Sequence, residues 1–157
     1  MTYNADFMRT AIALATENIS SNAWWPFGCV IVKNGEIIGR GNNRVTSTND
    51  PTAHAEVVAI RDACKNLDSF QLDGCDVYTS CEPCPMCLGA LYRARPDKIY
   101  YANTRADAAA IGFDDDMMYE EMVLPLEQRK IPIEQVLRWE ALESFQLWKE
   151  KEDKVEY

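Results

Sequence analysis

One histidine and two cysteines have the residue types and spacing of a metal-binding group. His54 is the only histidine in the 157-residue chain, and Cys84 and Cys87 form a Cys-x-x-Cys pair further along it. An imidazole and two thiolates fill three tetrahedral positions of Zn²⁺ and leave the fourth open for water, as in catalytic zinc sites. Glu56, two positions after the histidine, is an acid–base group that could take a proton from this water. These four residues predict one catalytic Zn²⁺ per chain, with Glu56 as the proton shuttle.

The two cysteines are expected at the N-terminal end of a helix. Cys84 precedes Pro85, a residue type favoured at the first helical position, and Cys87 follows one turn later, where free N–H groups and the helix dipole favour thiolates. A closed structural site is an alternative, because Cys81 could supply a fourth ligand, and redox-active or inert thiols are a further one. Glu56 favours the open site. The remaining cysteines, Cys29, Cys64 and Cys75, are interpreted as small buried apolar residues.

The histidine is expected in the opening turns of an earlier helix. Asp50-Pro51 reads as an N-cap followed by proline at the first helical position, and the helix is predicted to run to about Asn66. Residues two apart on a regular helix point to different faces. His54 and Glu56 can therefore serve one cavity only if the metal lies beyond the helix end.

Alternating helical and strand-like patterns predict an α/β fold of three αβα layers around a mixed sheet of about five strands. Helices are expected at residues 4–19, 50–66 and 85–94 and in a late segment that carries Leu142, Phe145 and Trp148. Strands are expected at 27–32, from 37 onward, and at 76–80, 98–102 and 135–139, with Asn34-Gly35 as a hairpin turn. No linker or repeat divides the chain, so residues 1–157 are expected to form one domain.

Composition narrows the classes of partner. The chain has 16 basic and 25 acidic residues, a formal charge of −9, which disfavours binding to a nucleic-acid backbone and favours a small molecule. No stretch is long and apolar enough for a membrane span, and no secretion signal precedes the first helix, so no membrane partner is expected. A chain with clustered thiols and no secretion signal is expected in the reducing cytoplasm.

Several blocks of sequence resemble the cytidine-deaminase-like superfamily and, within it, the short zinc-dependent guanine deaminases of bacteria. The order His-x-Glu followed by Pro-Cys-x-x-Cys is the signature of zinc deaminases. The similarity covers nearly the whole chain, in segments 26–28, 41–43, 49–56, 80–90 and 112–115. The Gly-Phe-Asp-Asp block at 112–115 and the C-terminal Tyr157 resemble the purine-base branch in particular.

This resemblance implies a role for individual residues. It makes His54, Cys84 and Cys87 the zinc ligands and Glu56 the proton shuttle, in a cytidine deaminase-like fold. The base would be held by Phe27, which stacks on the ring, by Asn43 and by the backbone near Ala55. Asp115 would read the polar edge of guanine, because a buried acceptor discriminates against bases that lack the matching N–H groups, and Asp114 would be structural.

The implied reaction is zinc-dependent hydrolytic deamination of guanine to xanthine and ammonia. A related deaminase acting on a nucleoside such as guanosine, a tRNA adenosine deaminase and a zinc-stabilised interaction module without catalysis are alternatives. The net charge disfavours the tRNA substrate. Two departures from the family pattern, Arg93 in place of an aromatic residue and Trp24-Trp25 in place of a glycine-rich approach to Phe27, leave the pocket shape and substrate open.

The resemblance also implies a homodimer with a swapped C-terminal segment of about residues 141–157. Tyr157 would then complete the site of the other subunit. The apolar stripe of Phe145 and Trp148 could equally pack within its own core, and a frayed terminus is the alternative for Tyr157.

Overall fold

The computed structural model describes residues 3–21, 25–113 and 115–155. The chain divides into two compact units, Met1–Tyr119 and Glu120–Tyr157. The first unit contains the sheet and the residues that the sequence singled out for zinc binding. Each unit is described by itself.

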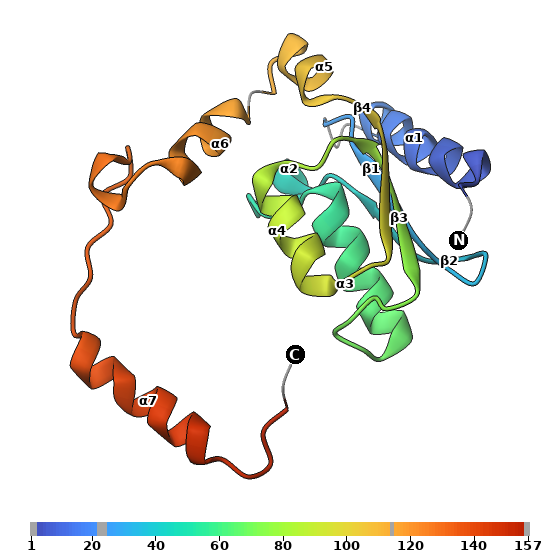
Figure 1. The fold of residues 1–157 in the computed structure, drawn as a ribbon. Coiled ribbons are helices and arrows are strands. Elements are labelled where there is room, and N and C mark those ends of the chain that lie inside the picture. The colour runs from blue at the N-terminus through green and yellow to red at the C-terminus, as the bar shows by residue number, and fades with distance from the viewer. Residues whose placement is uncertain (1–2, 22–24, 114, 156–157) are drawn as a thin grey trace. The chain divides into compact units, whose positions relative to one another are not determined.

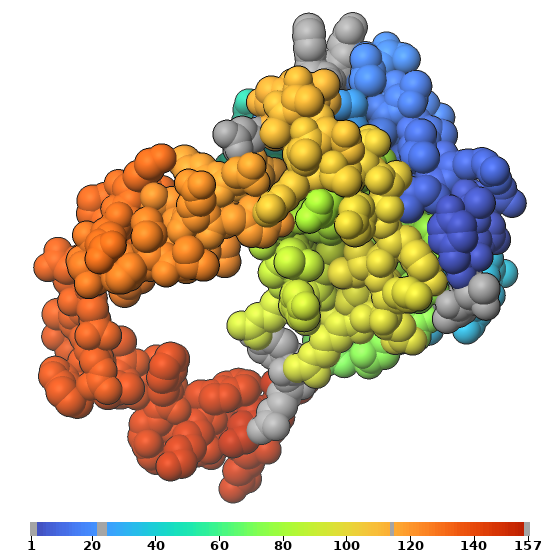
Figure 2. Space-filling view, turned by 45° about the horizontal axis from the view of Figure 1, so that its top comes forward, coloured from blue at the N-terminus to red at the C-terminus, as the bar shows by residue number. Residues whose placement is uncertain are grey.

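A mixed sheet of four strands forms the centre of the first unit, in the order β2-β1-β3-β4 (Figure 1). β1 runs antiparallel to β2 and β3, and β4 runs parallel to β3. The strands are β1 (Gly28–Lys33), β2 (Glu36–Asn42), β3 (Cys75–Cys81) and β4 (Lys98–Asn103). The predicted hairpin turn is confirmed, because Asn34 and Gly35 both have positive φ, 52° and 81°. β4 is an edge strand, and its part of the chain (yellow) lies open on the surface (Figure 2).

Helices cover both faces of this sheet, so the predicted three αβα layers are confirmed. α1 (Ala5–Ser20) lies on one face and α3 (Ala55–Leu67) and α4 (Pro85–Ala94) lie on the other (Figure 1). Successive side chains of β1 point to opposite faces. Cys29 and Ile31 therefore join the core beneath α3 and α4, whereas Val30 and Val32 join the core beneath α1.

Two glycines let α3 approach the sheet closely. A Cβ atom at Gly41 would lie 2.0 Å from the carbonyl oxygen of Ala55, and one at Gly39 would lie 2.6 Å from Cβ of Ala63. Both contacts are closer than any side chain permits. Glycine on β2 and alanine on α3 thus set the distance between helix and sheet, and with it the place where α3 begins.

The helix that the sequence placed at 50–66 begins later, at Ala55, and ends at Leu67. Its expected N-cap, Asp50, instead accepts hydrogen bonds from the backbone N–H and hydroxyl of Thr52, which closes a turn. His54 is consequently the N-cap of α3, with extended backbone angles, and does not lie in the opening turns. The expected helices at 4–19 and 85–94 agree with α1 and α4.

The strand expected at 135–139 is wrong, and the sheet has four strands where about five were predicted. Residues 132–137 have no regular secondary structure and pair with no strand among the described residues, and Leu137 has left-handed backbone angles as the N-cap of the following helix. Arg138 already belongs to α7 (Arg138–Glu150), the late helix predicted from Leu142, Phe145 and Trp148.

The second unit contains α7 and the 3₁₀ turn η1 (Leu126–Gln128), and α6 (Asp116–Val123) crosses the boundary from the first unit. Two short helices, α2 (Val45–Thr48) and α5 (Arg105–Ala110), belong to the first unit. None of the described residues of the second unit is buried. No helix in the described part of the chain is both long and apolar enough to cross a membrane.

Candidate active site

The three predicted zinc ligands come together. The ligand atoms of His54, Cys84 and Cys87 all lie within 4.8 Å of one another, and Nδ1 of the histidine lies 3.6 Å from Sγ of Cys84. A tetrahedral Zn²⁺ with bonds of about 2.0–2.3 Å separates its ligands by roughly 3.3–3.8 Å. One nitrogen and two sulfur atoms at these separations fit zinc. Cys81 is outside the group and its thiol donates to the carbonyl of Thr104 at 3.6 Å, so the donor set has three members, as an open site requires.

Two helix N-termini position these ligands. His54 and Cys84 are the N-cap residues of α3 and α4, both with extended backbone angles, and Cys87 follows in the first turn of α4 after Pro85. Each helix thereby turns its unpaired N–H groups and the positive end of its dipole towards the group, where they stabilise thiolates. The expected position of Cys84 just before a proline-initiated helix is confirmed.

Hydrogen bonding within the group prepares one sulfur as a thiolate even without metal. The bond from the Cys87 thiol is the largest of the effects that lower the pKa of Cys84 to about 4, and the bond with His54 acts in the same direction. The same bond raises the pKa of Cys87, because it favours the protonated donor. Binding of zinc would displace this remaining proton.

Glu56 lies in the same cavity, in the first turn of α3, with 6% of its surface exposed. Its Oε1 accepts a hydrogen bond from the hydroxyl of Thr79 on β3 at 3.0 Å. Burial raises the pKa of this carboxyl group, and hydrogen bonds from its own backbone N–H, from Cys87 and from Thr79 oppose the increase. The site therefore places a proton-accepting group beside the ligands, away from bulk water.

A cavity of about 280 Å³ opens over the ligand group. Its wall includes the aromatic rings of Trp25, Phe27, Phe113 and Tyr119. Phe113 meets two of the other rings edge to face, with centroid distances of 5.0 Å to Phe27 and 5.1 Å to Trp25. Trp25 also meets the ring of His54 at 6.5 Å. Such walls favour a flat aromatic ligand. Asp115, which is partly buried, adds a carboxylate to the same wall.

Asn43 is fully buried just after β2, and only half of its amide is used by the protein. Its Oδ1 accepts from the backbone N–H of Val45 at 3.1 Å, whereas its Nδ2 has no hydrogen-bond partner among the described residues. A buried donor without a partner is costly. Its Nδ2 thus remains available as a donor, although Asn43 is not among the residues of the cavity wall.

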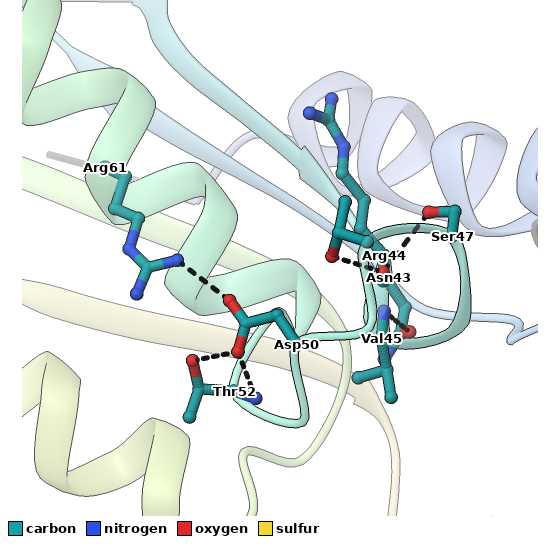
Figure 3. A network of polar contacts seen from close by, with 8 residues as sticks. Asn43, Arg44, Val45, Ser47, Asp50, Thr52 and Arg61 are labelled. Atoms are coloured by element: carbon teal, nitrogen blue, oxygen red, sulfur yellow. Dashed lines mark hydrogen bonds and ion pairs between the residues drawn. The ribbon is translucent and has the colours of Figure 1, made fainter.

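A polar network holds the loop between Asn43 and α3 (Figure 3). The carbonyl oxygen of Arg44 accepts from the hydroxyl of Ser47 at 3.2 Å, and Asp50 pairs with Arg61 of α3 at 3.5 Å while it closes the turn with Thr52. The loop thus contacts the middle of α3, at Arg61. A backbone bond from the N–H of Arg44 to the carbonyl oxygen of Ala53, at 2.8 Å, joins the residue after Asn43 to the residue before His54.

The structure places some of the remaining predicted residues at the cavity and others away from it. Phe27 and Asp115 line the cavity, and Ala55 is buried at the start of α3 beside the zinc ligands. Arg93 is exposed on α4 and is not among the residues of the cavity wall. Three residues that the resemblance singled out, Trp24, Asp114 and Tyr157, lie outside the described residues.

Other residues at the cavity had no assigned role in the sequence. Phe113 belongs to a segment that the resemblance singled out, so its aromatic type was a usable signal. Tyr119 donates from its hydroxyl to the carbonyl oxygen of Pro83 at 3.2 Å, and Glu82 accepts from the backbone N–H of Arg105 at 3.0 Å. These contacts connect the loop before Cys84 to the segment that carries Asp115, and no local pattern in the sequence indicates them.

Comparison with known proteins gives a consistent set of relatives. Residues 1–103 match the family model of the cytidine and deoxycytidylate deaminase zinc-binding region. The chain is 54% identical over 151 residues to the guanine deaminase of Bacillus subtilis, a match that covers 96% of this chain and 97% of that protein. It is 47% identical over 77 residues to a tRNA-specific adenosine deaminase of Aquifex aeolicus, 49% of this chain and 51% of that one.

Solved structures agree with this pattern. The X-ray structure of the guanine deaminase from Bacillus subtilis superposes with a TM-score of 0.96 and 52% identity, over 99% of both chains. A structure of the guanine deaminase from Nitrosomonas europaea superposes with a TM-score of 0.68 and 32% identity, over 73% of this chain and 66% of that one.

Proposed function

Because the chain belongs to the cytidine and deoxycytidylate deaminase family of zinc enzymes, we propose that it catalyses the hydrolytic deamination of guanine to xanthine and ammonia. The observation that carries this proposal is the cavity in which buried Glu56 lies beside the His54, Cys84 and Cys87 donor set. The near-full-length similarity to a guanine deaminase selects the substrate among those that such a cavity could process.

The reaction needs a nucleophile and a carrier for two protons. His54, Cys84 and Cys87 would hold the zinc, which would lower the pKa of a water molecule and so supply the nucleophile. As the water oxygen adds to the carbon that bears the exocyclic amine, Glu56 would take one proton and pass it to the adjacent ring nitrogen. Glu56 would then carry the remaining hydroxyl proton to the departing nitrogen, so that ammonia leaves and a carbonyl oxygen remains. The bond from Thr79 orients the carboxylate for both transfers.

The rest of the cavity holds the base. Phe27 on the cavity wall stacks on the purine ring. The unpaired Nδ2 of Asn43 and the backbone at Ala55 provide hydrogen-bonding groups, as the family resemblance implies, although neither residue is part of the wall. The carboxylate of Asp115 accepts hydrogen bonds from N–H groups on the polar edge of guanine, which adenine lacks at the matching positions. The small purine base is thus the partner that the site accommodates.

Three alternative functions have less support. The tRNA-specific adenosine deaminases match shorter parts of the chain, from 76 to 121 residues, and the charge of −9 opposes binding to a phosphate backbone. A purely structural zinc site would be expected to have four protein ligands, whereas three donors lie together in the described residues. No particular contact favours a nucleoside such as guanosine over the free base.

The direct test is the substitution Glu56→Gln in zinc-loaded protein. Turnover of guanine, followed by the ultraviolet change to xanthine and by ammonia release, should fall by about 10²–10⁴-fold, because loss of general acid–base catalysis costs that much. Zinc content should remain one ion per chain, and Glu36→Gln on the exposed end of β2 should leave turnover unchanged. Wild-type rates in Glu56→Gln would exclude the shuttle, and turnover of guanosine, adenine or cytosine in place of guanine would exclude the proposed substrate.

We further propose that the enzyme is a cytoplasmic homodimer in which the C-terminal segment of one chain completes the site of the other. Several large apolar side chains of the second unit are exposed, including Trp139 at 79% and Phe145 at 73%. β4 leaves an unpaired strand edge in the described part of the chain, and residues 132–137 form no regular secondary structure. The boundary at Glu120 suggests that the crossing segment includes more than residues 141–157. Tyr157 would then act in the partner's site, and a reducing compartment would keep the cysteine ligands available.

A further inference from the structure

A buried asparagine of α1 has a bonding pattern that neither the sequence nor the reaction explains. Asn18 is 0% exposed and lies on the helix face that otherwise buries Met8, Ala11 and Ala15. A buried amide destabilises a protein unless its polar atoms are hydrogen-bonded. The role of Asn18 therefore depends on the groups to which its side-chain amide is hydrogen-bonded.

The amide of Asn18 connects two segments that flank the cavity. Its Nδ2 donates to the carbonyl oxygen of Trp25 at 2.7 Å and to that of Asn43 at 2.9 Å, and its Oδ1 accepts from Nδ2 of Asn42 at 2.7 Å. The first segment leads into Phe27, whose backbone N–H donates to the same carbonyl of Trp25 at 2.9 Å. The second carries the side chain with the free Nδ2.

These bonds lie just where the regular strand pairing stops. β1 and β2 pair up to Gly28 and Asn42, and one further backbone bond joins Asn43 N–H to the carbonyl oxygen of Phe27 at 3.1 Å. Beyond that point, Asn18 holds both chains from the side of α1. Besides that backbone bond, Asn18 is the side chain that joins the segment leading to Phe27 to the backbone of Asn43.

Only an asparagine fits these requirements. Aspartate has no N–H group for the two carbonyl oxygens, and leucine, of similar size, can neither donate nor accept. Glutamine has the same groups on a chain longer by one methylene, which a fully buried site accommodates poorly. The residue type is thus dictated by the two segments and not by the helix, in whose interior asparagine has low propensity.

We propose that Asn18 is a positioning residue for the base: it sets the aromatic ring of Phe27 and the amide of Asn43 at the separation that binds a purine. This inference rests on the proposed function, because it takes those two residues as the base-binding groups. Asn18 is absent from the cavity wall and acts only through its neighbours.

Steady-state kinetics of Asn18→Ala with guanine tests the role. We expect KM to rise about tenfold or more and kcat to change by less than about threefold, because interactions that bind substrate and transition state equally affect KM alone. Zinc content should stay at one ion per chain, since the ligands lie on α3 and α4. The matched control is Asn66→Ala, which removes an asparagine amide that also donates to a strand carbonyl, that of Ile38 at 2.8 Å, but at an exposed position away from the cavity. The control should keep the wild-type KM.

A double-mutant cycle separates positioning from general stability. If Asn18 acts through Phe27, the effect of Asn18→Ala on KM should largely disappear in a Phe27→Ala background. Equal effects of Asn18→Ala in both backgrounds, or equal effects of Asn18→Ala and Asn66→Ala, would overturn the proposal. Asn18→Ser, which keeps one hydroxyl donor, should give a smaller rise in KM and serves if the alanine variant does not fold.

Amide hydrogen exchange tests the positioning role of Asn18 independently of the proposed function. Loss of the Asn18 amide should speed exchange at the N–H groups of Phe27 and Asn43 and leave residues 58–66 of α3 unchanged. If the wild-type enzyme fails to turn over guanine, the proposed substrate is wrong, but faster exchange would still support the positioning role. Unchanged exchange at both sites would refute it whatever the substrate.

Discussion

Asp115 places a carboxylate on the cavity wall, where it is partly buried. The chain already has nine more negative than positive charges at neutral pH. The charge of Asp115 is one of the smaller causes that raise the pKa of His54, after the hydrogen bond with Cys84. In the proposed function this carboxylate also accepts hydrogen bonds from the N–H groups on one edge of guanine.

Replacing Asp115 by asparagine should therefore impair selection of the base. The substitution removes a charged acceptor and adds a donor, and hydrogen bonds to charged groups contribute about 1.5–3 kcal/mol, so kcat/KM for guanine should fall roughly 10- to 150-fold. Asp116→Asn is the matched comparison: this neighbour also lines the cavity but pairs with Arg105 at 3.8 Å, so its loss should have a much smaller effect. Equal losses in the two variants would contradict direct recognition by Asp115.

Residues differ in how far the sequence could predict them. His54, Cys84, Cys87 and Glu56 could be predicted because zinc chemistry restricts both their types and their local spacing. The role of Asn18 could not be predicted. In the sequence, an asparagine that ends a helix looks the same as one that donates to carbonyl groups 7 and 25 residues away. Bonds between distant segments leave no local pattern.

At the scale of elements, the start of α3 determines where the zinc ligands lie. The composition of Asp50-Pro51 is typical of a helix start, yet the carboxylate of Asp50 is used by Thr52 and the helix begins only at Ala55. That later start makes His54 an N-cap and solves the difficulty that residues two apart on a helix face different ways. The sequence could predict the helix, whereas competition between two local bonding patterns decided its first residue.

The close packing of α3 on β2 predicts a specific sensitivity at Gly41. In Gly41→Ala the added methyl group meets the backbone of Ala55 at 2.0 Å, so the first turn of α3 must move. We expect the free energy of unfolding to fall by about 1–3 kcal/mol, as for other overpacked positions. Zinc affinity should fall as well, because His54 directly precedes the displaced turn. Urea denaturation and a competition titration with a zinc chelator would measure the two effects.

Gly89 provides the opposite case for comparison with Gly41. It lies on the exposed face of α4, and a Cβ atom there meets nothing within 4 Å. Gly89→Ala should raise the free energy of unfolding by about 0.5–1 kcal/mol through helix propensity and leave zinc affinity unchanged. A similar response of both glycine variants would mean that the spacing of α3 and β2 does not control the metal site.

At the scale of the whole molecule, the two units differ in how many of their described residues are buried. The first unit buries apolar side chains on both faces of its sheet, whereas the second has no buried residue among those described. The sequence could predict the first, because its elements alternate in a pattern that only a layered sheet satisfies. It could not predict whether residues 135–139 form a strand, because that depends on which strand edge, in which chain, is available to pair with them.

Association through the second unit is the last testable consequence. Phe145 lies on α7 with 73% of its surface exposed, and burying a phenylalanine contributes about 1.5–3 kcal/mol, which a two-fold symmetric dimer would lose twice in Phe145→Glu. Sedimentation should show the wild type at the mass of two 17.9 kDa chains and this variant dissociating at roughly 10²- to 10⁴-fold higher concentration. Ile19→Glu adds the same charge at an exposed apolar position of α1 and should stay dimeric.

A wild type that remains monomeric at every concentration would rule out the dimer. If the variant is monomeric but keeps full guanine turnover, the segment joins the chains without completing the partner's site, because a subunit that needs Tyr157 from its partner must lose activity when the two separate.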